Sequence, residues 1–184
     1  TGVLKQRNRD GLWVGAEGQV YEEWLNDVHI ISRFDIPPSW RRIRTIDFGY
    51  NNPFVCQWWA IDHDDRMYLY RELYMSGRTV ARHKVDICIY SRGETYEATI
   101  ADHDAEDRAT LAEQTTVNDP ALTARLVTAG FSKDAAGNVL LPGISTRAAD
   151  KRVKVGIEKV QERLRLSGNG KPRIFLMVDS LIAD

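Results

Sequence analysis

The stretch Arg44-Thr45-Ile46-Asp47-Phe48-Gly49-Tyr50-Asn51-Asn52-Pro53 reads as a short apolar strand with an acid in it, followed by a glycine and a turn. A carboxylate on a central strand is costly to bury unless it is paired or binds a cation. About fifty residues later, Ala98-Thr99-Ile100-Ala101-Asp102-His103-Asp104 repeats this pattern of an apolar run that ends in acids. Two strands that each bring an acid to one place suit Mg²⁺ or Mn²⁺, which are hard ions that prefer oxygen ligands.

The order of the remaining elements places these two strands in a fold. Alternating and apolar runs predict strands at 43–48, 54–62, 66–75, 97–102 and 173–178, and a short one at 139–141. Helical patterns cover 78–92, with Ala81, Val85 and Cys88 on one face, and 107–114, 120–130 and 148–166. Three antiparallel strands followed by parallel strands, all flanked by helices, are typical of a ribonuclease-H-like mixed sheet. In that fold the first strand and the strand after the first helix are neighbours, so Asp47 and Asp102 should meet.

Composition narrows the class of protein. The chain has 184 residues, 43% of them hydrophobic and 28% charged, which indicates about one globular domain. The net charge of -1 gives no overall basic field, so an anionic partner must be held by a local patch or through metal ions. Cys56 and Cys88 are expected to be buried thiols in a reducing compartment. With no apolar run of membrane-spanning length, no secretory signal and no phosphate-binding Gly-x-x-x-x-Gly-Lys motif, we expect a cytoplasmic protein without membrane contact.

The acids also have plainer interpretations. Asp47 alone could cap the turn at Asn51-Asn52, but Asp102 at the matching point of the second strand favours a metal site. Two like charges this close should raise each other's pKa, and a divalent ion would neutralise them. Asp104 is either an additional metal ligand or the N-cap of the helix that follows it.

Basic residues near the longest predicted helix form a second candidate site. Arg147, Lys151, Arg152 and Lys154 cluster at its start, where they could bind DNA phosphates or simply form a solvated helix face. Glu72, in the third strand, is expected to be an outward-facing acid paired with a neighbouring arginine.

Taken together, these stretches resemble the C-terminal nuclease domain of the large terminase subunit of tailed double-stranded DNA bacteriophages. The resemblance runs over most of 11–179 and rests on the order and spacing of several segments. They are Gly11-Leu12-Trp13-Val14-Gly15-Ala16-Glu17-Gly18-Gln19-Val20-Tyr21, Ile46-Asp47-Phe48-Gly49-Tyr50, Tyr70-Arg71-Glu72-Leu73-Tyr74, Ala101-Asp102-His103-Asp104 and Ala149-Asp150-Lys151 with Gly156-Ile157.

The resemblance implies a two-metal endonuclease that cuts concatemeric double-stranded DNA during packaging. Asp47 matches the first metal-binding acid, which bridges the two Mg²⁺ or Mn²⁺ ions, and Asp102 matches the second. The family's third acid has no match in this sequence and is expected beyond Asp184. Residues 1–40 then form a linker segment from an ATPase domain, and 41–184 form the nuclease domain without its C-terminal end.

The same resemblance implies partners and a location. We expect double-stranded DNA, the ATPase domain of the same polypeptide, the portal protein and the small terminase subunit as partners, in the host cell cytoplasm. The sequence has no heptad pattern, so the isolated domain is expected to be a monomer. Two other functions remain open: another ribonuclease-H-like nuclease, of resolvase or transposase type, or a non-catalytic module that docks on DNA or the portal.

Overall fold

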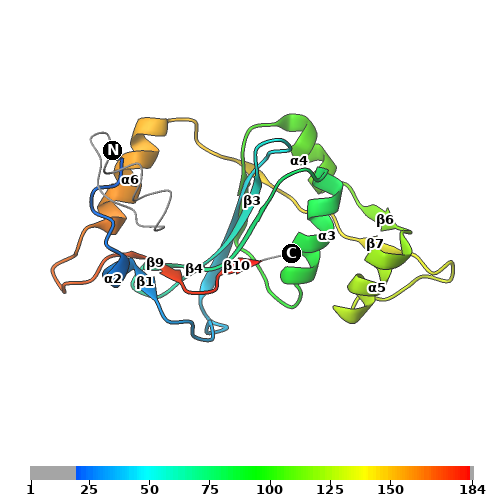
Figure 1. The fold of residues 1–184 in the computed structure, drawn as a ribbon, viewed down its shortest axis with the longest axis horizontal. Helices are drawn as coiled ribbons and strands as arrows, with labels where there is room; N and C mark the ends of the chain where they lie inside the picture. The colour runs from blue at the N-terminus through cyan, green and yellow to red at the C-terminus, as the bar shows by residue number, and fades with distance from the viewer. Residues whose placement is uncertain (1–19, 183–184) are drawn as a thin grey trace, which may run out of the picture.

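A twisted mixed sheet with α3 and α4 on one side and α6 on the other organises the protein (Figure 1). The computed structural model describes residues 20–182. Its helices are α2 (Asn26–His29), α3 (Val80–Tyr90), α4 (Ala105–Ala112), α5 (Pro120–Thr128) and α6 (Val153–Leu164). Its strands are β1 (Ile30–Ile31), β2 (Arg41–Asp47), β3 (Phe54–Ile61), β4 (Met67–Met75), β5 (Ala98–Ala101), β6 (Thr115–Val117), β7 (Val139–Leu141), β8 (Arg147–Ala148), β9 (Ile174–Met177) and β10 (Leu181–Ile182).

The strand order of the main sheet is β1-β9-β4-β3-β2-β5-β8, and β10 pairs with β4 beside β9. β3 is antiparallel to both of its neighbours, β2 and β4, whereas β5, β8, β9, β10 and β1 join through parallel pairings. The predicted ribonuclease-H-like mixed sheet flanked by helices is therefore confirmed. β6 and β7 form a separate two-stranded antiparallel sheet beyond α3, with α5 between them in the chain (Figure 1).

Burial along β3 explains why this strand is central. Phe54, Cys56, Trp58 and Ala60 alternate toward the helix-covered face and are fully buried. Trp59, which follows Trp58 across an irregularity in the register with β4, is buried as well, at 8% exposure. Burying an aromatic side chain on each face stabilises the sheet by several kcal/mol in total, at roughly 1.5–3 kcal/mol per large side chain.

Side-chain oxygens fix where three helices begin. Thr79 accepts a hydrogen bond from the Arg82 amide at the start of α3, and Asp104 and Asp119 do the same for α4 and α5. Pro120 occupies the first turn of α5, where its missing amide proton costs nothing. In α3, Val85 and Cys88 are buried as predicted, but Ala81 is exposed, and the early turns pack on the sheet through His83, which stacks on Phe54 of β3 at 4.0 Å between ring centroids.

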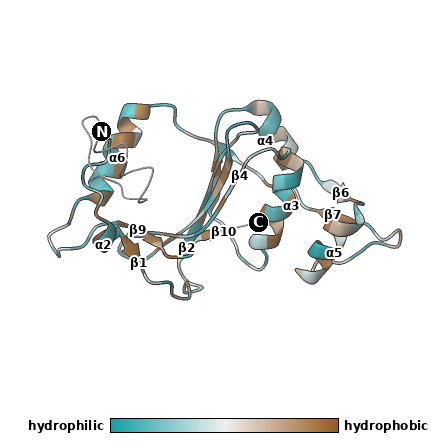
Figure 2. Ribbon diagram, viewed as in Figure 1, coloured by the Kyte–Doolittle hydropathy of each residue, from teal (hydrophilic) through white to brown (hydrophobic). Residues whose placement is uncertain are grey.

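The predicted helix 148–166 is shorter than expected. α6 begins at Val153, and Arg147 and Ala148 instead form β8, which pairs with β5. Val153, Ile157, Val160 and Leu164 recur at helical spacing in this range, but only Leu164 is buried, and Val153 is 73% exposed. Figure 2 accordingly shows both hydrophobic and hydrophilic residues along α6. The reason is that only the C-terminal end of α6 reaches the rest of the domain, where His29 Nε2 bonds the Leu164 carbonyl at 2.9 Å.

The predicted linker segment contributes to the sheet where the structure describes it. β1 pairs with β9 in parallel, with Ile30 opposite Leu176. The stretch Gly11 to Gln19, used in the family resemblance, lies outside the described residues. None of the described helices has the length and apolar character needed to cross a membrane.

Candidate active site at the end of the central strands

Two neighbouring parallel strands bring Asp47 and Asp102 together. Ile46 of β2 lies opposite Ala101 of β5, and the Asp102 amide donates to the Ile46 carbonyl at 3.1 Å. Asp47 and Asp102 therefore occupy the next matching positions, with α-carbons about one strand spacing apart, roughly 4.8 Å. The expectation that these residues meet in space is confirmed.

Alternation along the strands directs both carboxylates to one face. Ile46 and Ala101 are buried under the helices, so the next side chains, Asp47 and Asp102, leave the opposite face. Both acids are exposed. An exposed pair of carboxylates on a rigid sheet edge has the oxygen chemistry that Mg²⁺ or Mn²⁺ requires, so these residues fit the expected metal.

The electrostatics of Asp102 differ from the sequence-based expectation. Repulsion from Asp47 was expected to raise its pKa, but the pKa of Asp102 is lowered. The main cause is a hydrogen bond from the His103 backbone amide, and the nearby positive charge of Lys151 acts in the same direction. The Asp102 carboxylate is therefore ionised at neutral pH.

Asp104 and His103 follow Asp102 but differ in their surroundings. The Asp104 Oδ1 atom accepts from the amides of Glu106 and Asp107 at 3.1 and 2.9 Å, which confirms the N-cap interpretation. Its role as a further metal ligand stays a prediction and competes with this cap. His103 Nδ1 lies 3.7 Å from Asp102 Oδ1, beyond hydrogen-bond distance.

The four predicted DNA-binding residues separate into different positions. Arg147 is on β8 opposite Ile100, on the same face as the acid pair, and is exposed. Lys151 is close enough to Asp102 to lower its pKa. Arg152 instead pairs with Asp150 at 2.5 Å, which holds the pKa of that acid at about 2. Lys154 lies in the first turn of α6 and is exposed.

A row of polar side chains beside the acid pair was not anticipated from the sequence. Gln57 Nε2 donates to Glu72 Oε1 at 2.6 Å, and the side-chain Oε1 of Gln57 accepts from Trp59 Nε1 at 3.3 Å. Thr45, Gln57 and Glu72 are in register across β2, β3 and β4. The partner of Glu72 is thus a glutamine and not the expected arginine. In the sequence, the available signal was one polar residue within each of three otherwise largely apolar strands.

A third acid is not part of the site within residues 20–182. No group of three or more His, Cys, Asp or Glu side chains that could hold a metal occurs in this range. β10 does lead toward the acid pair, because Ile182 lies opposite Leu73, and Leu73 lies in the same row as Cys56 and Ile46. The expected third acid beyond Asp184 remains a prediction.

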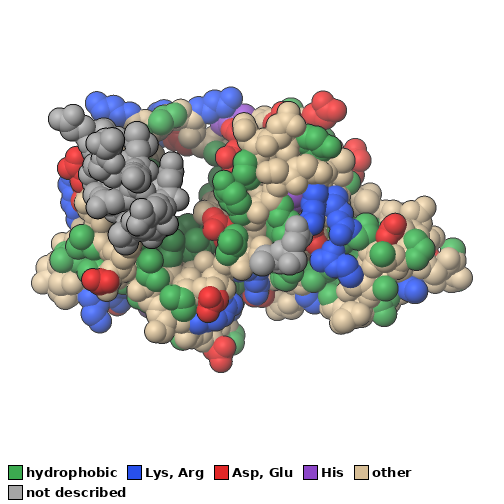
Figure 3. Space-filling view, in the orientation of Figure 1, with side chains coloured by type: hydrophobic (Ala, Val, Ile, Leu, Met, Phe, Trp, Pro, Cys, Tyr) green, Lys and Arg blue, Asp and Glu red, His purple; other side chains and the backbone are tan. Residues whose placement is uncertain are grey.

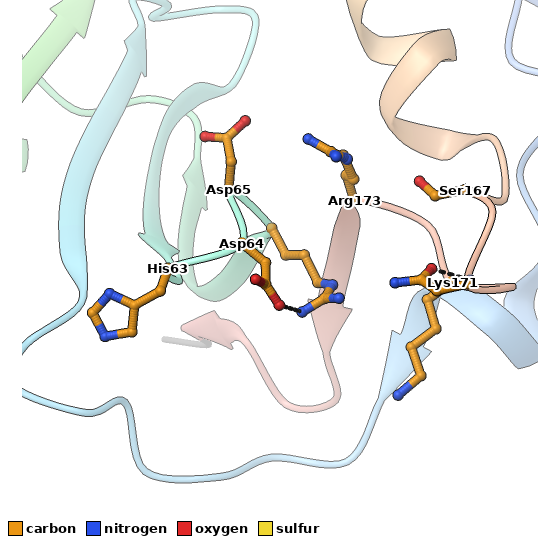
Figure 4. A pocket seen from close by; sticks show the side chains of 8 residues that line it. His63, Asp64, Asp65, Ser167, Lys171 and Arg173 are labelled. Atoms are coloured by element: carbon orange, nitrogen blue, oxygen red, sulfur yellow. Dashed lines mark hydrogen bonds and ion pairs between the residues drawn. The ribbon is translucent and has the colours of Figure 1, made fainter.

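A cavity of about 520 Å³ opens at the other end of the sheet, between the β3–β4 turn and the α6–β9 turn. β2 runs six residues from Arg41, beside that turn, to Asp47, so the cavity is roughly 20 Å from the acids. In Figure 4 the side chains of Asp65 and Arg173 point one way, whereas those of His63 and Lys171 point another. The cavity therefore lacks a convergent set of reactive groups.

Comparison with known proteins identifies the architecture. No protein-family model matches the chain, and no curated protein matches it. The chain has the ribonuclease-H-like architecture of a terminase nuclease domain. It resembles the P22 large terminase nuclease domain with a TM-score of 0.52 and 18% identity, covering 88% of this chain and 73% of that one.

A larger solved structure is also similar. The large terminase from a thermophilic bacteriophage, in complex with ADP, matches with a TM-score of 0.60 and 21% identity. The match covers 98% of this chain and 39% of that chain, so the sequence spans about two fifths of the thermophilic phage protein. At these identities the likeness establishes the fold.

Proposed function

We propose that this chain is the metal-dependent endonuclease domain of a phage DNA-packaging terminase. The observation that carries the proposal is the register of β2 and β5, which places Asp47 and Asp102 side by side on the open face of the sheet. The shared fold with terminase nuclease domains supports the choice among ribonuclease-H-like enzymes.

Asp47 and Asp102 would hold the Mg²⁺ or Mn²⁺ ions, with Asp47 shared between two of them. When bound, such ions supply a nucleophile at neutral pH and stabilise charge on the transferring phosphate. Because the Asp102 carboxylate is ionised, it contributes its full charge to this binding. Arg147 and Lys151, beside Asp102, would hold the phosphate backbone of double-stranded DNA across the acids. The ATPase domain of the same polypeptide, the portal protein and the small terminase subunit are the proposed partners.

Nicking of supercoiled plasmid in Mn²⁺ tests this proposal. Wild-type protein should nick the plasmid, and EDTA should stop it. Asp47→Asn and Asp102→Asn should each reduce the rate by roughly 10²–10³-fold, because an ion supplies several kcal/mol of transition-state stabilisation. Asp27→Asn is the matched control, since Asp27 is an exposed aspartate on α2 and its loss should leave the rate unchanged.

The alternative function, a non-catalytic docking module on DNA or the portal, is favoured by the absence of a third acid among residues 20–182. Titration with Mn²⁺, followed by calorimetry, separates the two. Binding that Asp47→Asn abolishes and Asp27→Asn preserves supports the nuclease. A protein that binds DNA but takes up no Mn²⁺ and leaves plasmid intact is a docking module.

A further inference from the structure

The ring of His103 brings a nitrogen atom beside the carboxylate of Asp102. His103 Nδ1 lies 3.7 Å from Asp102 Oδ1. The histidine side chain as a whole is 34% exposed, but its Nδ1 atom is buried and has no hydrogen-bond partner among residues 20–182. Leaving a buried polar atom without a partner costs free energy. This nitrogen therefore lacks a ligand that the described chain itself does not supply.

The backbone on both sides of His103 holds the ring at this place. β5 ends at Ala101, and the Asp102 amide still donates to the Ile46 carbonyl at 3.1 Å. Asp104 caps α4 immediately after His103. The Asp102 carboxylate also accepts a hydrogen bond from the His103 backbone amide. His103 thus lies between two anchored residues, so its position relative to the acid pair is set by the sheet and the helix start.

The separation of 3.7 Å decides what can satisfy both groups. It is too long for a direct hydrogen bond between the ring and the carboxylate. Two ligands of one small divalent ion lie roughly 3–4 Å apart, because each bond to the ion is about 2.1 Å long. A neutral imidazole nitrogen and an ionised carboxylate are both ligands of divalent ions. The pair His103 and Asp102 therefore has the spacing and the chemistry of two ligands of one ion.

His103 is better placed for this role than Asp104, the extra ligand expected from the sequence. Asp104 Oδ1 already accepts from the amides of Glu106 and Asp107 at 3.1 and 2.9 Å, whereas His103 Nδ1 has no such partner. Figure 3 shows acidic, basic and histidine side chains gathered along the upper edge of the molecule, over α4 and the chain that leads to α6. No three candidate ligands converge within the described part of the chain, so water and substrate oxygens would complete the ion's shell.

We propose that His103 Nδ1 is a ligand of the divalent ion held by Asp102, and that it favours transition-metal ions such as Mn²⁺ over Mg²⁺. This proposal rests on the proposed function, because it takes the acid pair as a metal site. Mg²⁺ prefers oxygen ligands and loses its water reluctantly, whereas imidazole nitrogen binds first-row transition ions with an affinity that rises from Mn²⁺ to Co²⁺ and Ni²⁺. The nitrogen of His103 thus adds affinity for Mn²⁺ that Mg²⁺ does not share.

Pulsed electron paramagnetic resonance of Mn²⁺ bound to the protein, without DNA, tests this assignment. A nitrogen bound to Mn²⁺ modulates the echo, and isotopic labelling of the histidine nitrogens changes the modulation frequency, so the wild-type result needs no variant. His103→Gln should remove the modulation. His63→Gln is the matched control, because His63 is an exposed histidine at the opposite end of the sheet, and this variant should keep it. Both variants should keep the wild-type melting temperature.

Calorimetric titration with each ion measures the selectivity. His103→Gln should weaken Mn²⁺ binding about three- to tenfold and Co²⁺ binding by more, while Mg²⁺ binding stays within about twofold of wild type. Equal losses for Mn²⁺ and Mg²⁺ in His103→Gln would show that the histidine only positions Asp102 and would overturn the proposal. Nitrogen modulation that is missing in wild type, or that persists in His103→Gln, would overturn it as well.

The nicking assay separates this proposal from the proposed function. Wild-type protein that binds Mn²⁺ without nitrogen modulation and still nicks plasmid contradicts the role of His103 alone. Protein whose nitrogen modulation is lost in His103→Gln, but which never nicks plasmid, contradicts the endonuclease alone. Wild-type protein that takes up no Mn²⁺ contradicts both.

Discussion

Replacing Asp86 with asparagine tests how the buried carboxylate joins α3 to α5. The change keeps the shape of the side chain but removes the charge that two arginines contact at 2.8 and 3.4 Å. By Coulomb's law a unit charge pair at these distances is worth about 5–6 kcal/mol with an effective dielectric constant near 20. Desolvation of Asp86 and the partial exposure of both arginines reduce the net loss to roughly 1–3 kcal/mol. For a domain of this length that lowers the melting temperature by about 2–10 °C.

Thermal and urea unfolding of Asp86→Asn, Arg125→Gln and the double variant measure this effect. If the two residues act together, the losses in unfolding free energy should not add. The loss in the double variant should be smaller than the sum of the two single losses, by about 1 kcal/mol or more. Asp27→Asn, which removes an exposed aspartate, is the control and should unfold as wild type does. Melting of Asp86→Asn within 1 °C of wild type, or strict additivity with Arg125→Gln, would refute the reasoning.

Three further predictions concern the loop after the acid pair and the dependence of stability on pH. A Cβ atom at Gly49 would lie 2.5 Å from the Asn52 carbonyl oxygen, so Gly49→Ala should cost about 1–3 kcal/mol in urea unfolding and slow plasmid nicking; wild-type stability and rate would contradict this. Burial lowers the pKa of His83 from 6.5 to about 4, so on acidification the unfolded chain binds a proton before the folded chain does. The free energy of unfolding should therefore fall by up to roughly 3 kcal/mol as the pH drops from 6.5 to about 4. His83→Leu should remove this pH dependence in urea unfolding, and a variant that keeps it would contradict the assignment. Burial alone would raise the pKa of Glu94, but hydrogen bonds from Tyr96 and Arg71 and the charge of Arg71 lower this pKa below 4.5. The ionised Glu94 therefore stabilises the fold above pH 4.5, and this stability is lost in more acidic solution. In urea unfolding, Glu94→Gln should reduce the loss of stability below pH 4.5, and an unchanged loss would contradict this.

The strand pattern was accurate because burial imposes it directly on the sequence. The run at 54–62 appears as β3 over Phe54–Ile61, and the short strand at 139–141 appears as β7. Asp47 and Asp102 were also placed correctly, since their strands are neighbours in the fold that the element order predicts. Local turn chemistry agreed as well, with Asp104 as the cap of α4.

The errors arose where contacts distant in sequence decide local structure. The predicted helix 148–166 included Ala148, yet Ala148 forms β8 together with Arg147, because the free edge of β5 offers backbone partners. Glu72 was assigned an arginine partner, but the register of β4 with β3 presents Gln57 instead. The contacts between Asp86 and Arg125 join residues thirty-nine apart and left no periodic signal.

The sequence by itself determined the class of fold and the strands that carry Asp47 and Asp102, because hydrophobic periodicity is a property of the residues themselves. The divalent ion that two carboxylates suit stays a prediction from ligand chemistry. Only the tertiary structure decided that the pKa of Asp102 is lowered, that Arg152 pairs with Asp150 while the charge of Lys151 acts on Asp102, and that the buried Asp86 of α3 pairs with Arg125 of α5. These outcomes depend on distances between charges and on their burial, which sheet register and helix docking set.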